Sequence, residues 1–556
     1  TGAILRERQS MKNSKTKLLI LIPALLVAGI YYYVALPAIN IHSAGLWWFL
    51  IFALAVVFVI HIVRRAAGKA GKKIVGYTPV EISLKGDKAG KILLILILAA
   101  IVIFFVGDIL SSPFINARRY QQLMTVEDRV FTQDIAPVDY NTIPLLDKSS
   151  AAILGDRKMG SMADMVSQFV VMDEYSQINF RGRPTRVSPL GYASPIKWLT
   201  NQKNGIPAYM RIDMSTQETE CVKLEQGIHY SKAEYFNRNI YRHLRFHYPT
   251  YIFDSQIFFE IDEDGVPYWV CPVKKFNIGL FGGQTVGRVV LCNAVTGECI
   301  DYAVEDVPQW IDKVYSAELL MDLYDYHGTL QHGFWNSVLS QRDCLQSTNG
   351  YNYIALDDDV WVYTGVTSVN ADQSNVGFVL MNQRTMETRY YQMEGAIEDS
   401  AMSSAEGKVQ NLGYRSTFPL LLNIDGEATY FMALKDAAGL VKMYAMVNVQ
   451  QYQYVATGDT IRDCEKMYRE MLVSKGISTI APGELQEAAG IIEVLQPVVL
   501  EGNTHYYLCL QGDDHIYDVD LSNTALIDAI RFQVGDRVKF AYEQTGSLCT
   551  VTEWKE

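Results

Sequence analysis

The sequence lacks the local signatures of common hydrolases and nucleotide-binding enzymes. It contains no H-E-x-x-H zinc-protease motif, no G-x-S-x-G nucleophile elbow and no Walker G-x-x-x-x-G-K-[ST] loop. The glycine-rich stretch 279–287 lacks the lysine of a phosphate-binding loop, and we expect a flexible connection or a bulge there. The nine histidines are dispersed along the chain. We therefore predict no catalytic residue, no cofactor and no enzymatic activity.

Positive charge is scarce outside the N-terminal region. Residues 1–119 carry 15 Lys and Arg against 4 Asp and Glu, whereas residues 120–556 carry 34 against 57. A strongly acidic surface repels nucleic acid, so we predict no nucleic-acid ligand. The Asn-x-Ser/Thr glycosylation sequon is also absent, which favours a bacterial surface over a eukaryotic secretory route.

Three apolar runs near the N-terminus are long enough to cross a bilayer, which takes about 20 residues per helix. They are Leu18–Leu36, Trp47–Val63 and Ile92–Leu110. Lys and Arg flank the first run and fill the connection between the second and third, but the connection Pro37–Gly45 has none. The positive-inside rule then predicts a cytoplasmic N-terminus and an extracytoplasmic chain from about residue 111 onward.

Aromatic residues gather at the junction between the first two runs. Amphipathic rings favour the membrane–water boundary. We therefore expect an interfacial hairpin there, with five residues at the interface: Tyr31, Tyr32, Tyr33, Trp47 and Trp48.

All eight cysteines lie in the acidic part of the chain, and their even number permits disulfides. Their spacing matches no zinc module. Cys292 and Cys299 flank a turn-like stretch and can face each other across a hairpin, while Cys509 and Cys549 share the last domain. Each pair is a candidate disulfide, with free buried thiols as the alternative.

Three segments repeat an apolar residue, an aspartate, a short turn and an aromatic strand: IDEDGVPYWV (261–270), LDDDVWVY (356–363) and IDGEATYF (424–431). Asp and Gly at such positions favour tight hairpin turns, which is our prediction. Calcium binding is the alternative, because acids clustered in turns bind that ion, although no D-x-D-x-D-G loop is present. The calcium candidates are Asp262, Asp264, Asp357, Asp358 and Asp359.

A second kind of strand pair also recurs, at 206–224, 286–302, 376–391 and 443–455. Two of these copies share a Val-Gly-x-Val core that is followed by an asparagine. Helical signals come after each copy: a Ser231–Glu234 capping box, Asp306 before Pro308, the stretch 394–410, and Thr460. We predict an α+β fold in which a tandem array of antiparallel strand meanders is closed by helices.

A hairpin of the form strand–D/N-x-x-T-G-E–strand beside a helix, carried here by CNAVTGEC (292–299), resembles the PepSY-type modules of bacterial envelope proteins. The resemblance implies an extracytoplasmic binding or regulatory module without a catalytic site. After a Pro- and Gly-containing linker come about five alternating strands. The turn Val534–Val538 resembles that of small OB-like or SH3-like barrels, and we predict a small C-terminal β-barrel.

The predicted segments are a membrane anchor (1–119), a connecting part (120–200), two repeat pairs (201–330 and 331–473), a linker (474–489) and the barrel (490–556). The 34 tyrosines are typical of interfaces and of sugar-binding clefts, but they also fill sheet faces. We predict a membrane-anchored extracytoplasmic scaffold that self-assembles into a homo-oligomer and has other envelope proteins as further partners. The alternatives are a cell-wall or carbohydrate-acting enzyme or binding component, and an envelope sensor or regulator of a neighbouring membrane protein.

Overall fold

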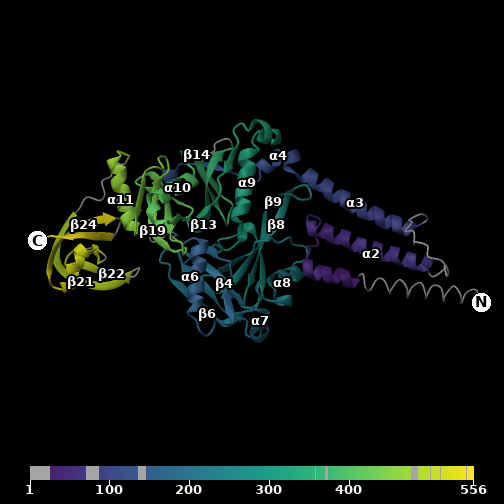
Figure 1. The fold of residues 1–556 in the computed structure, drawn as a ribbon, viewed down its shortest axis with the longest axis horizontal. Coiled ribbons are helices and arrows are strands. Elements are labelled where there is room, and N and C mark those ends of the chain that lie inside the picture. Colours follow the sequence, from purple (N-terminus) through teal and green to yellow (C-terminus); the bar gives the residue numbers. More distant parts are fainter. Residues whose placement is uncertain are drawn as a thin grey trace, which may run out of the picture. The chain divides into compact units, whose positions relative to one another are not determined.

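The computed structural model describes residues 25–70, 87–135, 144, 146–356, 358–369, 374–477, 486–500, 503–513, 515–521, 523–545 and 548–555. The chain divides into two compact units. Figure 1 labels their main helices and strands. The first unit comprises Thr1–Asp134 and Asn141–Glu398, and the second comprises Ile135–Tyr140 and Asp399–Glu556. The predicted α+β class is confirmed, because helices and several antiparallel sheets share the chain.

Apolar helices begin the first unit. A short one spans Leu25–Ala35, and two long ones follow, α2 (Ala44–Ala70) and α3 (Lys88–Ser111). Both long helices have the length and composition needed to cross a membrane, and almost none of their span surface is buried within the chain. They contain the second and third predicted runs, whereas residues 18–24 of the first predicted run lie outside the described residues.

Four sets of consecutive strands form antiparallel meanders in chain order. Meander one is β3 (Ser176–Phe180), β4 (Arg183–Tyr192), β5 (Ile206–Asp213) and β6 (Thr219–Ile228); meander two is β7 (Phe258–Ile261), β8 (Pro267–Ile278), β9 (Gly282–Asn293) and β10 (Cys299–Ala303). Meander three is β12 (Asn352–Leu356), β13 (Asp359–Ser368), β14 (Ser374–Asn382) and β15 (Thr388–Ala396); meander four is β17 (Leu420–Ile424), β18 (Glu427–Lys435), β19 (Val441–Asn448) and β20 (Val455–Gly458). The short strands β1 (Glu127–Arg129), β2 (Phe169–Val171), β11 (Leu345–Ser347) and β16 (Arg415–Ser416) extend these sheets.

The aspartate-containing segments are hairpin turns between the first two strands of meanders two, three and four. Asp358 and Asp425 have positive φ angles of 66° and 55°, as a tight two-residue turn requires. In meander two, the Asp262 carboxylate accepts the backbone amide of Val266 at 2.8 Å. The predicted turns are therefore confirmed, although Asp357 lies outside the described residues.

A second turn, between the third and fourth strands, has one geometry in meanders one to three. A side-chain oxygen of Asp213, Asn293 or Asn382 accepts the backbone amides two and three residues later, at 2.8–2.9 Å. The residue four positions on has a positive φ in each case, and these residues are Gln217, Gly297 and Met386. One Asp or Asn therefore sets this turn locally.

The remaining helices are α4 (Pro113–Gln121), α5 (Phe131–Asp134), α6 (Lys148–Gly160), α7 (Pro195–Asn201), α8 (Ile240–His247), α9 (Ala317–Thr329), α10 (Glu398–Lys408) and α11 (Ile461–Ser474). Thr460 caps α11 as predicted, because its hydroxyl accepts the Asp463 amide at 3.1 Å. The helix starts expected at Ser231 and Pro308 are wrong. The Glu234 carboxylate accepts from the Tyr192 hydroxyl and the Trp198 indole instead of closing a capping box.

Meander two lies between two hydrophobic cores. On one face Phe259 and Trp269 pack with side chains of meander one, and on the other Val270 and Leu291 pack with meander three and α9. In the second unit the last five strands form a closed barrel, which confirms the predicted C-terminal barrel. Its strands are β21 (Gln486–Leu500), β22 (Asn503–Leu510), β23 (Ile516–Asp520), β24 (Arg537–Thr545) and β25 (Leu548–Trp554).

The glycine-rich stretch between β8 and β9 packs against the end of α3 and is not a free connection. The bulge, the other alternative, is confirmed, because the register of β8 with β9 shifts at Gly287. The Ser111 hydroxyl accepts the backbone amides of Leu280 at 2.7 Å and Phe281 at 3.1 Å. A Cβ on Gly282 would lie 2.2 Å from the Ser111 carbonyl oxygen and 2.4 Å from the Tyr120 hydroxyl. Glycine is required at this position because the backbones approach too closely for a side chain.

Candidate metal centre

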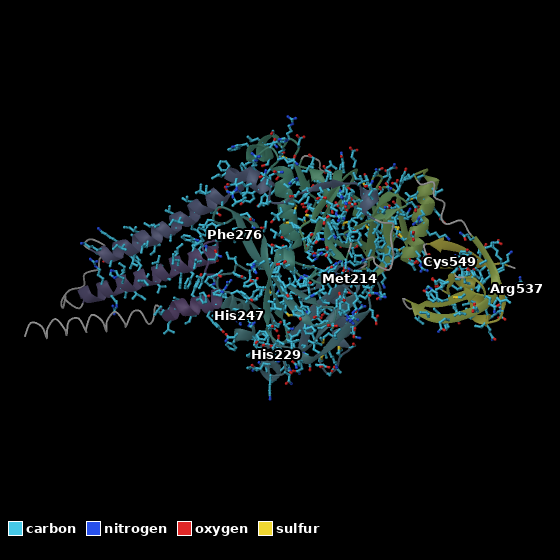
Figure 2. The ribbon with its side chains drawn as sticks, turned by 180° about the vertical axis from the view of Figure 1, so that it is seen from behind. Met214, His229, His247, Phe276, Arg537 and Cys549 are labelled. Carbon is cyan, nitrogen blue, oxygen red and sulfur yellow. The ribbon has the colours of Figure 1, made fainter. Side chains whose placement is uncertain are left out.

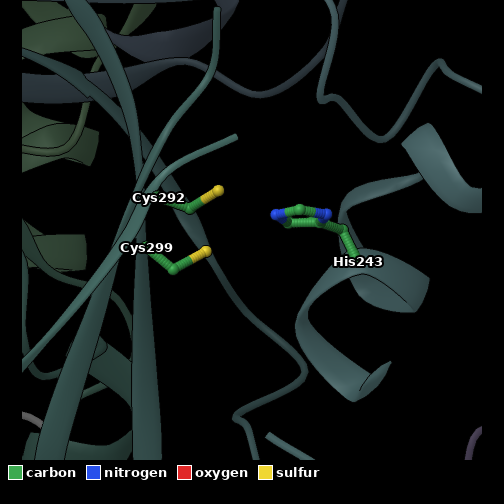
Figure 3. A group of neighbouring side chains, drawn as sticks. All are labelled: His243, Cys292 and Cys299. Carbon is green, nitrogen blue, oxygen red and sulfur yellow. The ribbon is translucent and has the colours of Figure 1, made fainter. Parts of the chain in front are cut away.

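Two thiols face one imidazole at the end of meander two. Cys292 is the residue before the last of β9 and lies directly opposite Cys299, which begins β10. The Asn293 amide donates to the Glu298 carbonyl at 2.9 Å, so the cysteine pair occupies the adjacent non-hydrogen-bonded position, where side chains come closest. Figure 3 shows both sulfur atoms pointing toward His243, which comes from α8.

The orientation of His243 is fixed by the hairpin itself. Its Nε2 lies 2.7 Å from the carbonyl oxygen of Gly297, in the turn between the two cysteines. That contact places a proton on Nε2, the ring nitrogen that Figure 3 shows on the side of the two sulfur atoms, so an ion bound there takes the place of the Gly297 contact. One ligand atom from each of the three residues can be chosen so that all lie within 4.8 Å of one another.

The three side chains are shielded from solvent to different degrees. Cys292 is fully buried and His243 is 9% exposed, whereas Cys299 is half-buried. A hydrogen bond between the two thiols lowers the pKa of Cys299 to about 5 and raises the pKa of Cys292. Burial opposes protonation of His243, but its contacts with Cys299 and Gly297 outweigh this and raise its pKa. Both shifts favour the charged forms of the two groups, a Cys299 thiolate and a protonated His243.

Further aromatic and sulfur groups surround the cluster. The rings of Tyr230 and His247 lie 4.3 Å and 4.2 Å from the His243 ring, measured between centroids. His247 Nδ1 is 2.8 Å from the His243 carbonyl oxygen, which leaves its Nε2 for another contact. Cys271 is fully buried, and burial holds its pKa well above the ordinary value. It shares the hydrophobic core of the cysteine pair.

The helix that carries His243 also contacts the first apolar helix. Arg245 Nε donates to the Leu36 carbonyl at 2.9 Å, and the Arg242 guanidinium lies 4.8 Å from the centroid of the Tyr33 ring. Figure 2 shows His247 on the side of the body from which the apolar helices leave. Helix α8 therefore touches both the thiol cluster and the membrane-type segment.

The equivalent positions in the neighbouring meanders hold different residues. In meander one Ile212 pairs with Thr219, and in meander three Met381 pairs with Thr388. Both hairpins make the same turn as the cysteine hairpin. The cysteine pair is thus particular to meander two.

The other predicted disulfide is not brought together. Cys509 lies on β22 and Cys549 on β25, and β23 separates these strands in the barrel. Strands two steps apart are about 10 Å distant, beyond the 4.4–6.8 Å between Cα atoms that a disulfide spans. All eight cysteines are free thiols in the structure.

The calcium candidates are held in protein contacts or at turns. Asp359 makes a two-bonded ion pair with Arg384, at 2.7 Å and 2.8 Å, and Asp358 accepts from the Asn179 side chain at 2.7 Å. The Asp262 carboxylate accepts amides of its own turn, including that of the exposed Asp264. Asp357 lies outside the described residues. The calcium alternative stays a prediction.

The predicted interface aromatics lie where the apolar helices meet the body. Tyr32 and Tyr33 contact Phe246 of α8, with centroids 6.3 Å and 6.2 Å apart, and Tyr31 stacks on Phe52. The Trp47 indole donates to the Ile41 carbonyl at 2.8 Å, and Trp48 is half-exposed beside Phe104.

His243 was missing from the sequence-based candidates. It lies 49 positions before Cys292, and only the packing of α8 on the hairpin brings the two together. The available signal was the pair His243 and His247, which four-residue spacing places on one face of a helix. The nine histidines were treated as scattered single residues, so this pair was not singled out from the sequence.

No protein-family model matches the chain, and no curated protein is significantly similar to it in sequence. The PepSY resemblance therefore stays a prediction.

Three chemistries are open to a thiol pair beside an imidazole: a cysteine nucleophile, a disulfide and a metal site. One ligand atom from each residue can lie within 4.8 Å of the other two, which favours metal binding, with a nucleophile and a disulfide as its competitors.

Proposed function

We propose that the protein is an integral membrane protein whose extracytoplasmic body binds a transition metal ion, Zn²⁺ above all, through Cys292, Cys299 and His243. The observation that carries the proposal is the convergence of these three donors within 4.8 Å. Two thiolates bound tetrahedrally to Zn²⁺ lie about 3.8 Å apart, so small side-chain shifts suffice. Thiolate and imidazole donors favour Zn²⁺ and Cu⁺ over Mg²⁺ and Ca²⁺.

The donor set suits an exchangeable ion. Structural zinc sites are closed by four protein ligands, whereas three leave one position for water or another molecule. An ion at Nε2 of His243 would replace the contact of this nitrogen with the Gly297 carbonyl, which also suits reversible binding. An exchangeable ion agrees with the sensor alternative derived from the sequence better than with a purely structural role.

Membrane placement is supported by the two long apolar helices and by the distribution of Lys and Arg around them. With the predicted first span included, this distribution favours a cytoplasmic N-terminus and an extracytoplasmic body. In the C-terminal barrel, β23 and β25 run parallel while the other pairs are antiparallel. A closed five-stranded barrel of this kind supports the OB-like alternative over the SH3-like one.

The test is metal content of the full chain, purified in detergent, reduced with a phosphine, stripped with a chelator and reloaded with Zn²⁺. We expect one ion per chain by plasma mass spectrometry, and none in Cys292→Met/Cys299→Thr. This variant copies the residues of meander three, so the turn should persist. Cys509→Ser is the matched control, because it removes one half-buried thiol from the barrel and should keep the ion.

Two results would contradict the metal proposal. One is an undiminished ion in Cys292→Met/Cys299→Thr. The other is a freshly isolated, metal-free chain in which peptide mass spectrometry finds Cys292 and Cys299 joined, since a disulfide consumes both thiolate ligands.

Self-assembly, the function expected from the sequence, is a second candidate that β6 supports. This strand of ten residues ends its sheet, and no described strand pairs with its outer edge. An unpaired edge of this length is a template for another chain. Light scattering on the detergent-solubilised chain should give an oligomer mass that falls on Lys223→Pro, a position whose amide faces the outer edge of β6, whereas a monomeric mass removes the proposal.

A further inference from the structure

Apolar side chains remain exposed where α3 ends. After Ser111 the chain turns through Pro113 into α4, whose Phe114 and Ile115 are 51% and 49% exposed. The last turn of α3 carries Ile109 and Leu110, which are similarly exposed. The apolar surface of the candidate span therefore continues past the residue at which the span ends.

A second segment adds to this surface. A short π-helix, Asn336–Ser340, follows Trp335, which is 63% exposed, and it carries Val338 at 53% and Leu339 at 75%. All three side chains are therefore more than half exposed within five positions of the chain. The Phe114 ring lies 5.6 Å from the Trp335 ring, so the two segments touch although 221 positions separate them.

We infer that Phe114, Ile115, Trp335, Val338 and Leu339 form a surface that inserts into the lipid interface beside α3. We name it the interfacial patch. The inference rests on the proposed membrane placement of α3. The occupant is lipid because the patch is continuous with the apolar surface of that helix, and a bilayer around the helix necessarily reaches its end.

The composition of the patch and its rim fits the boundary between acyl chains and headgroups. Tryptophan is enriched at this depth, and an amphipathic turn there lies in the plane of the membrane. Ser337 and Ser340 belong to the same turn as the apolar residues and add polar groups. Arg118 and Arg342 are exposed nearby in the sequence, where anionic headgroups can pair with them.

The experiment measures tryptophan emission from the full chain in nanodiscs that contain lipids brominated along their acyl chains. Bromine quenches only tryptophans that contact lipid. We expect Trp335→Phe to lower the quenched fraction of the emission relative to the wild type. Trp361→Phe is the matched control, since Trp361 is buried in meander three and should contribute nothing to the quenched fraction.

Trp48→Phe separates failure of the patch from failure of the membrane placement, because Trp48 lies on α2. If Trp48→Phe lowers the quenched fraction and Trp335→Phe does not, the spans lie in lipid and the patch is overturned. If neither variant changes it, membrane placement and patch are both overturned. The inference is also overturned if Trp335 is not quenched and a crosslink from this position joins two copies of the chain, because a second chain then covers the patch in place of lipid.

Discussion

Three hairpins of one geometry, β5–β6, β9–β10 and β14–β15, differ in the residue pair beside the turn. Each turn depends on one residue, Asp213, Asn293 or Asn382. The same turn forms whether the neighbouring pair is Ile and Thr, two Cys, or Met and Thr. The cysteines are therefore not needed to build the hairpin. What distinguishes the cysteine hairpin is the histidine that faces it, so the comparison assigns the pair a chemical rather than an architectural role.

A second position separates meander two from the others. Glu260 precedes the last residue of β7, and the corresponding residues are Asn179 in β3, Ala355 in β12 and Asn423 in β17. Glu260 is fully buried and accepts the backbone amides of Asp312 and Lys313, each at 3.0 Å. At this position meander two therefore has an ionisable side chain, whereas the other three meanders have a neutral one.

The largest expected effect comes from moving the thiol pair between hairpins. In a chain with Cys292→Met/Cys299→Thr, the further changes Met381→Cys/Thr388→Cys build a buried dithiol in meander three. Four-ligand zinc sites bind with about 10–16 kcal/mol, so the missing imidazole should cost about 3–4 kcal/mol. Competition with a chromophoric chelator should show Zn²⁺ affinity a few hundredfold below wild type. If the pair in meander three binds Zn²⁺ as tightly as the wild type does, the histidine is not what distinguishes the cysteine hairpin.

The turn between β8 and β9 should tolerate an added side chain less well than the first turn of meander four, between β17 and β18. Gly282→Ala forces a methyl group against the end of α3, and overpacking of this kind costs up to about 3 kcal/mol. Gly426→Ala has open space and bears only the strain of a positive φ, about 1 kcal/mol. Denaturant unfolding in detergent measures both. Equal losses would show that the β8–β9 turn does not pack on α3.

The smallest effect concerns Glu260 and pH. Burial raises the pKa of Glu260 from its ordinary 4.5 to about 7. Between these values the folded chain holds a proton that the unfolded chain has released, so stability falls as pH rises from about 4.5 to 7. Glu260→Asn, which copies meanders one and four, should flatten this slope by up to about 1.4 kcal/mol per pH unit. Thermal unfolding at three pH values measures it, and an unchanged slope contradicts the assignment.

Local chemistry explains which features were predictable from the sequence. Asp425–Gly426 and Thr460 act on their own neighbours, and so the turn and the cap followed from the residues. The capping box at Ser231 failed because Tyr192 and Trp198, which are distant in the chain, bind the Glu234 carboxylate. The opposition of Cys292 and Cys299 followed from hairpin spacing, but their histidine belongs to a helix placed by tertiary packing.

Helix α8 has only eight residues, a length of about 12 Å, and a rod this short has no room to bend. One of its faces meets the sulfur pair through His243, and Arg245 fixes it to the end of the first apolar helix. A displacement at the sulfur pair would then reach the apolar helix as a rotation of the whole of α8. Occupancy of the centre would be converted into tilt of a membrane-type helix across a single helix diameter, without a hinge or a relay of side chains.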